Sequence, residues 1–149
     1  MTQRTKRNPA FTLIEIMAVV VIIGLLMAIV GPRVIGAVSA NRIKAAGMQL
    51  QTIGNALTDY NLDNGRFPTT EQGLNALVEK PTTAPEPYAW RPGGYVEKMP
   101  KDPWGFDFNY VSPPEHGRDF DLWSYGRDGK AGGEGEDADI VNWSTDTEQ

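Results

Sequence analysis

The hydrophobic residues of this 149-residue chain are concentrated near its N-terminus. Every position from Ile16 to Val30 is apolar, fifteen residues in succession, and Phe11–Ile14 extends the stretch backwards with a single threonine. A helix over residues 11–31 has a length of about 30 Å, which matches the hydrocarbon core of a bilayer. The run is long for a secretory signal and no small-residue cleavage pattern follows it, so it predicts a permanent membrane anchor.

One carboxylate, Glu15, interrupts this segment. A charged side chain within a membrane helix is costly, so it is expected to have a partner or a function. Alternatively, Glu15 lies in the first turn at headgroup depth, where the positive end of the helix stabilises an anion. The chemistry of the residue alone leaves both interpretations open.

Beyond Pro32 the pattern becomes that of an amphipathic helix. Apolar residues recur at steps of 3, 4, 3, 4 and 3, which places them on one helix face. They are Ile43, Ala46, Leu50, Ile53, Leu57 and Tyr60. Asn64-Gly65 supplies a C-terminal stop. The pattern predicts one long helix over about 11–63, bent near Pro32, whose apolar stripe packs against a globular head.

The rest of the chain predicts a small head of short elements. Thr69-x-x-Gln72 matches a capping box for a short helix over about 70–79. Apolar and polar residues alternate from Phe106 to Tyr110 and from Phe120 to Ser124, which predicts two strands of a small antiparallel sheet within about 95–125. The predicted fold class is therefore α+β, a long N-terminal helix packed on a small sheet.

Charge separates the two ends of the chain. Residues 1–10 carry three basic side chains and no acid, which places the N-terminus in the cytoplasm and the rest across the membrane. Residues 102–149 carry twelve acidic side chains against three basic ones, a net charge of −9. Because nucleic-acid binding needs a basic face, no nucleic acid is expected as a partner.

The most acidic stretch, residues 128–139, lies within a predicted loop over 126–143. Five carboxylates share its twelve residues with four glycines. Such a loop is either solvated or gathered about a cation, and composition alone favours the solvated loop. Its oxygen donors suit calcium better than zinc, but Lys130 breaks the spacing of an EF-hand.

The residue types give little support to a catalytic site. The chain has no cysteine, which excludes disulfides and thiolate nucleophiles. The single histidine, His116, lies in a Pro-Pro-Glu-His-Gly loop, and no serine has the nucleophile-elbow pattern. The glycines at 132–135 lack the lysine of a phosphate-binding loop. We therefore predict that the chain is not an enzyme and that His116 makes a structural hydrogen bond.

The stretch from Ala10 to Met17, Ala-Phe-Thr-Leu-Ile-Glu-Ile-Met, resembles the processing motif of type IV pilins and pseudopilins. The resemblance implies that a prepilin peptidase removes leader residues 1–10 between Ala10 and Phe11 and then N-methylates Phe11. It also implies that Glu15 pairs with the N-terminal amine of a neighbouring subunit, so that the charge gains its partner in the polymer. The family normally has glycine where this chain has Ala10.

Later segments resemble the major pseudopilin of type II secretion systems. They are Arg66–Leu74, Asp102–Gly105, Glu115–Gly117 and Asp137–Trp143. The resemblance implies a pilin-like fold with a metal-binding loop near the C-terminus. It further implies that this loop binds calcium, with Asp128 and Asp139 as side-chain ligands and Asp137 as a further candidate.

The resemblance also implies a function and a location. Residues 11–31 would be the transmembrane and assembly half of the helix, and 32–149 the periplasmic head of a single-pass inner-membrane protein in a Gram-negative-type envelope. The subunit would polymerise into the periplasmic pseudopilus, which drives export of folded proteins through the outer-membrane secretin. The expected partners are copies of the chain, the prepilin peptidase, minor pseudopilins and the inner-membrane assembly platform.

Two alternatives to this interpretation stay open at the level of sequence. The first is a type IV pilin or a minor pseudopilin. The second is a membrane-anchored periplasmic calcium-binding module or hydrolase, which predicts a monomer.

Overall fold

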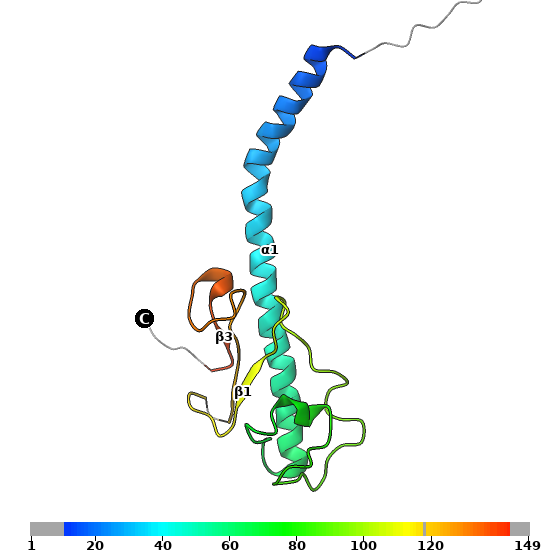
Figure 1. Cartoon of the computed structure of the whole chain (residues 1–149), viewed down its shortest axis with the longest axis vertical. Helices are drawn as coiled ribbons and strands as arrows, with labels where there is room; N and C mark the ends of the chain where they lie inside the picture. The colour runs from blue at the N-terminus through cyan, green and yellow to red at the C-terminus, as the bar shows by residue number, and fades with distance from the viewer. Residues whose placement is uncertain (1–10, 118, 144–149) are drawn as a thin grey trace, which may run out of the picture. The chain divides into compact units, whose positions relative to one another are not determined.

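The computed structural model describes residues 11–117 and 119–143, with only the backbone of 31–35. The chain forms two compact units, residues 1–38 and 39–149, which are considered one at a time. The predicted leader 1–10, with Ala10, lies outside the described residues. The elements in chain order are helix α1 (Leu13–Asn64), 3-10 helix η1 (Leu74–Leu77), strands β1 (Asn109–Val111) and β2 (Asp121–Ser124), 3-10 helix η2 (Gly135–Asp137) and strand β3 (Ile140–Val141) (Figure 1).

Helix α1 confirms the predicted long helix. It begins at Leu13 and ends at Asn64, against the expected 11–63, and its backbone stays helical through Pro32. Gly65 ends it with a φ of 69°, and its N–H donates a hydrogen bond to the Asn61 carbonyl at 2.7 Å. This left-handed residue satisfies a free carbonyl of the last turn, which is the usual way a helix stops at glycine. The bend near Pro32 stays a prediction.

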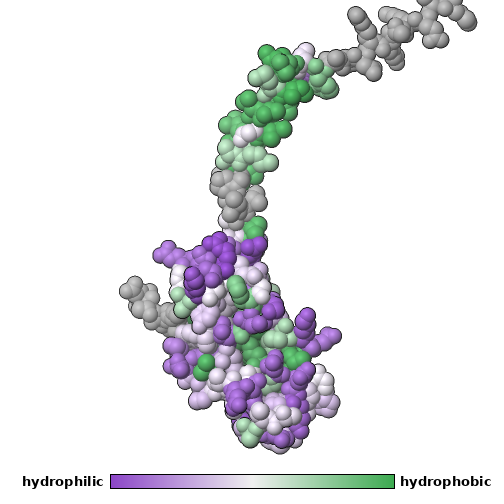
Figure 2. Space-filling model, in the orientation of Figure 1, coloured by the Kyte–Doolittle hydropathy of each residue, from purple (hydrophilic) through white to green (hydrophobic). Residues whose placement is uncertain are grey.

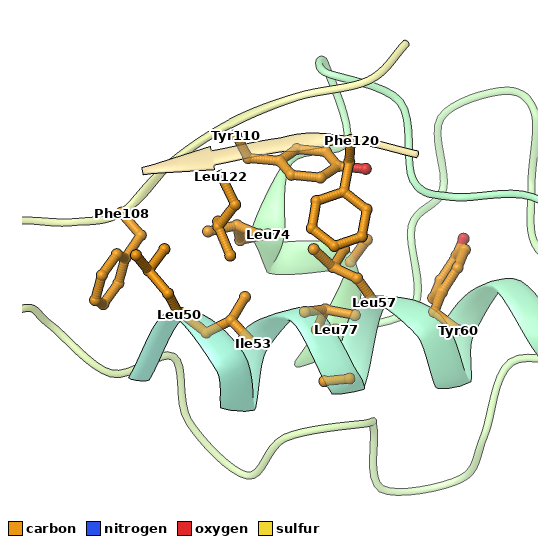
Figure 3. Packing of buried hydrophobic residues seen from close by; sticks show 12 residues of the cluster. Leu50, Ile53, Leu57, Tyr60, Leu74, Leu77, Phe108, Tyr110, Phe120 and Leu122 are labelled. Carbon is orange, nitrogen blue, oxygen red and sulfur yellow. The ribbon is translucent and has the colours of Figure 1, made fainter. Parts of the chain in front are cut away.

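The apolar stripe of α1 forms one wall of the core in the second unit. Five of its six predicted positions are buried, and Ile43 at its start is half-buried. Figure 3 shows stripe residues pointing toward Leu74 and Leu77 of η1 and toward Tyr110 and Leu122 of the strands. Burial raises the pKa of Tyr110 to about 12, and its hydroxyl donates a hydrogen bond to the Pro68 carbonyl at 2.7 Å. The core therefore joins α1 to the sheet, as the 3.6-residue period predicted.

The sheet has three antiparallel strands in the order β1-β2-β3. Tyr110 of β1 lies opposite Leu122 of β2, and both side chains are buried. The first strand is shorter than predicted. It begins at Asn109, and Phe106, which was expected within it, lies before it and is 46% exposed. The N–H of Phe106 donates instead to Asp102 Oδ1 at 2.8 Å, which holds residues 102–106 in a turn. Strand β3 was not predicted, because two residues are too few for an alternating pattern.

The predicted short helix after Thr69 is reduced to η1. The capping box itself forms, since the N–H of Thr69 donates to Gln72 Oε1 at 3.1 Å and the N–H of Gln72 donates to Thr69 Oγ1 at 3.2 Å. Gly73 then takes a φ of 60° and a ψ of −167°, which no α-helix accommodates. The element consequently covers only Leu74–Leu77 and not 70–79.

Candidate functional site

The first candidate site is the apolar half of α1. Leu13–Val30 is long and apolar enough to cross a membrane, and the chain itself buries none of it. Figure 2 shows this segment as a hydrophobic surface of large exposed side chains. A soluble monomer rarely exposes so large an apolar surface, so lipid or other protein is expected to cover it.

Phe11 and Glu15 lie at the start of this segment. Phe11 is exposed and immediately precedes Thr12, whose hydroxyl and carbonyl both accept hydrogen bonds from the N–H of Glu15, at 3.3 and 3.1 Å. Glu15 occupies the first turn of α1 and its side chain is exposed. The carboxylate is thus close to the positive end of the helix and accessible to a partner from outside the chain.

The second candidate site is the acidic loop, residues 126–143. The buried side chain of Asp102 holds the first residues of this loop in place. Asp102 Oδ2 accepts the Ser124 hydroxyl at 2.6 Å, and Ser124 Oγ accepts the N–H of Gly126 at 3.1 Å. Asp102 Oδ1 accepts the N–H groups of Trp104 and Phe106. These connected hydrogen bonds link the 102–106 turn to the end of β2 and to the first residues of the acidic loop.

Gly126 lies directly against the part of the loop that returns toward β3. Its φ is 70°, and a Cβ atom there would overlap the Glu136 carbonyl oxygen and lie 2.8 Å from that of Ala138. At Gly133, with a φ of 93°, an added Cβ atom would likewise overlap the Asp137 carbonyl oxygen. Glycine is therefore required where the two sides of the loop meet, and backbone carbonyls of 136–138 are brought next to residue 126.

Two of the loop carboxylates belong to an ion-pair cluster. Arg127 Nε donates to Asp137 Oδ1 at 2.9 Å and Arg127 Nη2 donates to Asp137 Oδ2 at 2.8 Å, a bidentate pair. Arg127 Nη1 also donates to Glu136 Oε2 at 3.2 Å. Arg42 of α1 lies near the other oxygen of the same carboxylate, its Nη1 3.8 Å from Glu136 Oε1. The hydrogen bonds and charge of Asp137 raise the pKa of the Arg127 guanidinium above its usual value.

Asp128 and Asp139 differ from this pair, because the described residues donate hydrogen bonds to them only through backbone N–H groups. Asp128 Oδ1 accepts the N–H of Lys130, and Asp139 Oδ2 accepts the N–H of Gly132, each at 3.0 Å. Asp139 Oδ1 is buried and accepts no hydrogen bond from the residues that the structure describes. Glu136 Oε1 is likewise buried without a donor among these residues, so oxygens that a cation such as calcium would satisfy occur at two places in the loop.

The three predicted metal ligands are therefore not equivalent. Asp137 is engaged by Arg127, while Asp128 and Asp139 each keep one oxygen that accepts no hydrogen bond from the described residues. Within residues 11–117 and 119–143, no three His, Asp or Glu side chains are close enough together to hold a metal ion. Calcium binding by this loop therefore stays a prediction.

His116 makes the structural hydrogen bond that was predicted. Its Nδ1 lies 3.0 Å from Oδ2 of buried Asp121, and its ring stacks on Trp143. The same carboxylate accepts the backbone N–H groups of Glu115, His116 and Gly117. Burial alone would raise the pKa of Asp121, but these hydrogen bonds outweigh it and leave the pKa below its usual value. The cluster fixes the 115–117 loop onto β2.

The sequence prediction missed Arg127 and Asp102 as residues of the acidic-loop site. Asp102 was recognised only as part of a family motif, and its partner Ser124 comes from a strand 22 positions away. Arg127 had a detectable signal, since it directly precedes the most acidic stretch and is one of only three basic residues after position 101.

Comparisons with known proteins identify the family. The profile described as "Type II secretion system (T2SS), protein G" matches residues 33–143, and the "Prokaryotic N-terminal methylation motif" matches residues 5–31. The chain belongs to the type II secretion system protein G family. This pseudopilin is 48% identical over 138 residues to the type II secretion system core protein G of Pseudomonas aeruginosa, covering 93% of this chain and 96% of that protein. It is 46% identical over 142 residues to core protein G of Vibrio cholerae, covering 95% and 96% respectively.

A solved structure supports the same family. The crystal structure of the major pseudopilin from the type 2 secretion system of enterohaemorrhagic Escherichia coli is 41% identical, with a TM-score of 0.65. The match covers 73% of this chain and 92% of that one. The pilin-like α+β fold and the resemblance to major pseudopilins are confirmed, and they favour the major pseudopilin over a type IV pilin, a minor pseudopilin or an anchored monomeric module. The family is one of structural subunits, while the lack of catalytic activity in this chain stays a prediction.

Proposed function

We propose that this pseudopilin is the repeating subunit of a periplasmic pseudopilus, held in the inner membrane before assembly by residues 11–31. Its head, with the amphipathic half of α1, lies in the periplasm, and the basic leader lies in the cytoplasm. The polymer pushes folded proteins through the outer-membrane secretin. Minor pseudopilins and the inner-membrane assembly platform are its further partners.

The observation that carries this proposal is the exposed apolar half of α1 with a single carboxylate in its first turn. The chain buries none of Leu13–Val30, so this surface has to be covered by lipid before assembly and by other helices after it. Removal of residues 1–10 creates a new amine at Phe11, four positions from Glu15. We propose that Glu15 pairs with this amine on a neighbouring copy, which compensates both charges inside the fibre.

We also propose that the acidic loop binds calcium. Asp128 and Asp139 are the side-chain ligands, Asp137 is a further candidate, and nearby backbone carbonyls complete the shell. Asp139 Oδ1, which is buried and accepts no hydrogen bond from the described residues, supports this assignment. A bound divalent cation would neutralise carboxylates that otherwise repel one another and would tie the start of the loop to its end.

The assembly role of Glu15 is tested by Glu15→Gln in the full chain, expressed in cells with the complete secretion system. We expect the amount of chain in sedimentable fibres recovered from the periplasm to fall at least about tenfold, because an amine left unpaired in a buried contact costs several kcal/mol. Glu97→Gln, a neutralised exposed carboxylate of the head, is the matched control and should assemble normally. Normal fibre yield from Glu15→Gln would refute the pairing.

Processing is tested by the intact mass of the chain extracted from its native membrane. We expect loss of residues 1–10 and the addition of one methyl group. A full-length mass would show that the leader is retained with Ala10 at this position, and the anchored monomer would then be the better description.

A further inference from the structure

The outer face of the sheet carries aromatic side chains that the core does not use. Leu122 of β2 is buried in the core, so its neighbour Trp123 points to the opposite face of the sheet. The Trp123 ring centroid lies 5.9 Å from that of Tyr125 and 6.0 Å from that of Trp143, at interplanar angles of 76° and 70°. Each of these half-buried rings therefore stands at a steep angle to the next, like adjacent walls of a box.

The three rings line one pocket of about 330 Å³. Val111 of β1 and Val141 of β3 contribute to its walls, as does His116, whose ring stacks on Trp143 with the centroids 4.8 Å apart. This volume is at the lower end of the range for ligand sites, so it suits a single side chain or a small molecule. Because strand pairing and the stacked ring hold the walls in place, the pocket is formed before a ligand binds.

Negative charge accompanies the aromatic walls of this pocket. Glu115, Asp121 and Asp139 also line it. Burial opposes the ionisation of Asp121, which is 1% exposed, but its hydrogen bonds outweigh burial and hold its pKa below the usual value. Among the side chains that the structure describes, no lysine or arginine forms an ion pair with any of the three carboxylates. Indole faces and carboxylates both attract cations, so the pocket favours a positively charged ligand.

We propose that this site, the aromatic pocket, binds an arginine side chain of another protein. A guanidinium group is planar, stacks on aromatic faces and pairs with carboxylates through its forked N–H groups, so it can use both kinds of wall. An anionic ligand would be repelled by the three carboxylates.

The position of the aromatic pocket determines where the arginine comes from, and this step rests on the proposed function. The inner face of the sheet packs on α1, and the aromatic pocket lies on the opposite face. In a fibre whose subunits join through the exposed half of α1, the face of the sheet away from α1 is turned outward. The arginine is therefore supplied by a protein that surrounds the fibre and not by a second copy of the chain.

The ligand chemistry is tested by titrating the full chain, in non-ionic detergent, with Nα-acetyl-arginine amide. Excess calcium is present throughout, so that the probe does not replace a metal ion in the acidic loop. The indole N–H signals in the NMR spectrum report binding, since Trp123 and Trp143 line the pocket and Trp90 and Trp104 do not. We expect saturable shifts at Trp123 and Trp143 alone. Nα-acetyl-citrulline amide, which has a similar shape without the charge, should bind at least about fivefold more weakly.

A matched pair of variants tests the contribution of charge. Glu115→Gln, at an exposed carboxylate of the pocket, should weaken binding of the arginine probe at least about threefold. Asp119→Asn makes the same change of charge at an exposed residue that does not line the pocket and should bind as wild type does. Equal binding of the arginine and citrulline probes, or no shift at either pocket tryptophan, would overturn the proposal. Shifts caused by chitobiose and not by the arginine probe would also overturn it, because the pocket would then be a glycan site.

The outward position is tested with single cysteines in assembled fibres, because the chain has no cysteine of its own. Glu115→Cys should react with a charged maleimide in fibres within about threefold of its rate in the solubilised chain, since no interface covers it. Protection of at least about tenfold would show that a second copy covers the pocket and would overturn its assignment to an outside protein. Met17→Cys, in the exposed half of α1, should be unreactive in fibres. If Met17→Cys reacts there, or if no fibres form, the proposed function fails, and the titration still decides whether the aromatic pocket binds arginine.

Discussion

Gly126 provides a quantitative test of how the acidic loop is built. Gly126→Ala adds one methyl group at a residue whose φ is 70°. A left-handed backbone costs a non-glycine residue about 1–2 kcal/mol. The new Cβ would also overlap the Glu136 carbonyl oxygen and lie 2.8 Å from that of Ala138, and both atoms belong to backbone that no rotamer change moves. Overpacking of this kind adds about 1–3 kcal/mol, so the total expected loss is about 2–5 kcal/mol.

The matched control for this substitution is Gly135→Ala. Gly135 lies in the same loop with a φ of 62°, but a Cβ atom there meets no atom within 4 Å. It should therefore lose only the conformational part, about 1–2 kcal/mol. Urea unfolding of the head followed by tryptophan fluorescence, in chelator and with the full chain in detergent, gives both free energies. Equal losses in the two variants would refute the close approach of residue 126 to the 136–138 backbone.

Two further predictions concern the core and the pH dependence of stability. Leu57→Ala, at a fully buried position of α1, should lower the free energy of unfolding by about 2–5 kcal/mol. Leu62→Ala, at a position of the same helix that is 74% exposed, should change it by less than about 0.5 kcal/mol. Similar losses at both sites would show that the stripe does not face the core. Because the pKa of Asp121 is lower in the folded state, its ionised form stabilises the head above the ordinary aspartate pKa of about 3.9, and this contribution is lost as the pH falls below that value through the folded pKa. Urea unfolding from pH 7 to 2 should show a weaker acid dependence for Asp121→Asn than for wild type, with exposed Asp119→Asn as control; an unchanged acid dependence would remove Asp121 from this role.

The acidic loop shows where prediction from sequence reached its limit. The charges of the loop and the calcium interpretation were accessible from the order of residues and the family motifs. The environments of the individual carboxylates were not, because Arg42 is 94 positions from Glu136, and Ser124 is 22 positions from Asp102. Contacts at such separations leave no periodic pattern in the chain.

The local elements show the same contrast on a smaller scale. The capping box of Thr69 and Gln72 formed as predicted, since its two partners are three positions apart. The helix expected after it was too long, because Gly73 adopts a backbone conformation that the sequence alone does not specify. Phe106 fitted the alternation of a strand, but Asp102 accepts its N–H and holds it in a turn.

The order of residues was enough to predict the long helix, its apolar and amphipathic halves, the side of the helix that faces the core, and the family. These features depend on short-range periodicity and on contiguous motifs, which are properties of neighbouring residues. Three features became known from the folded chain: which carboxylates are engaged by arginine, which glycines allow the loop to close, and that β3 completes the sheet. These depend on segments that are distant in the chain and meet only after folding, when burial and hydrogen bonding distinguish otherwise similar acidic residues.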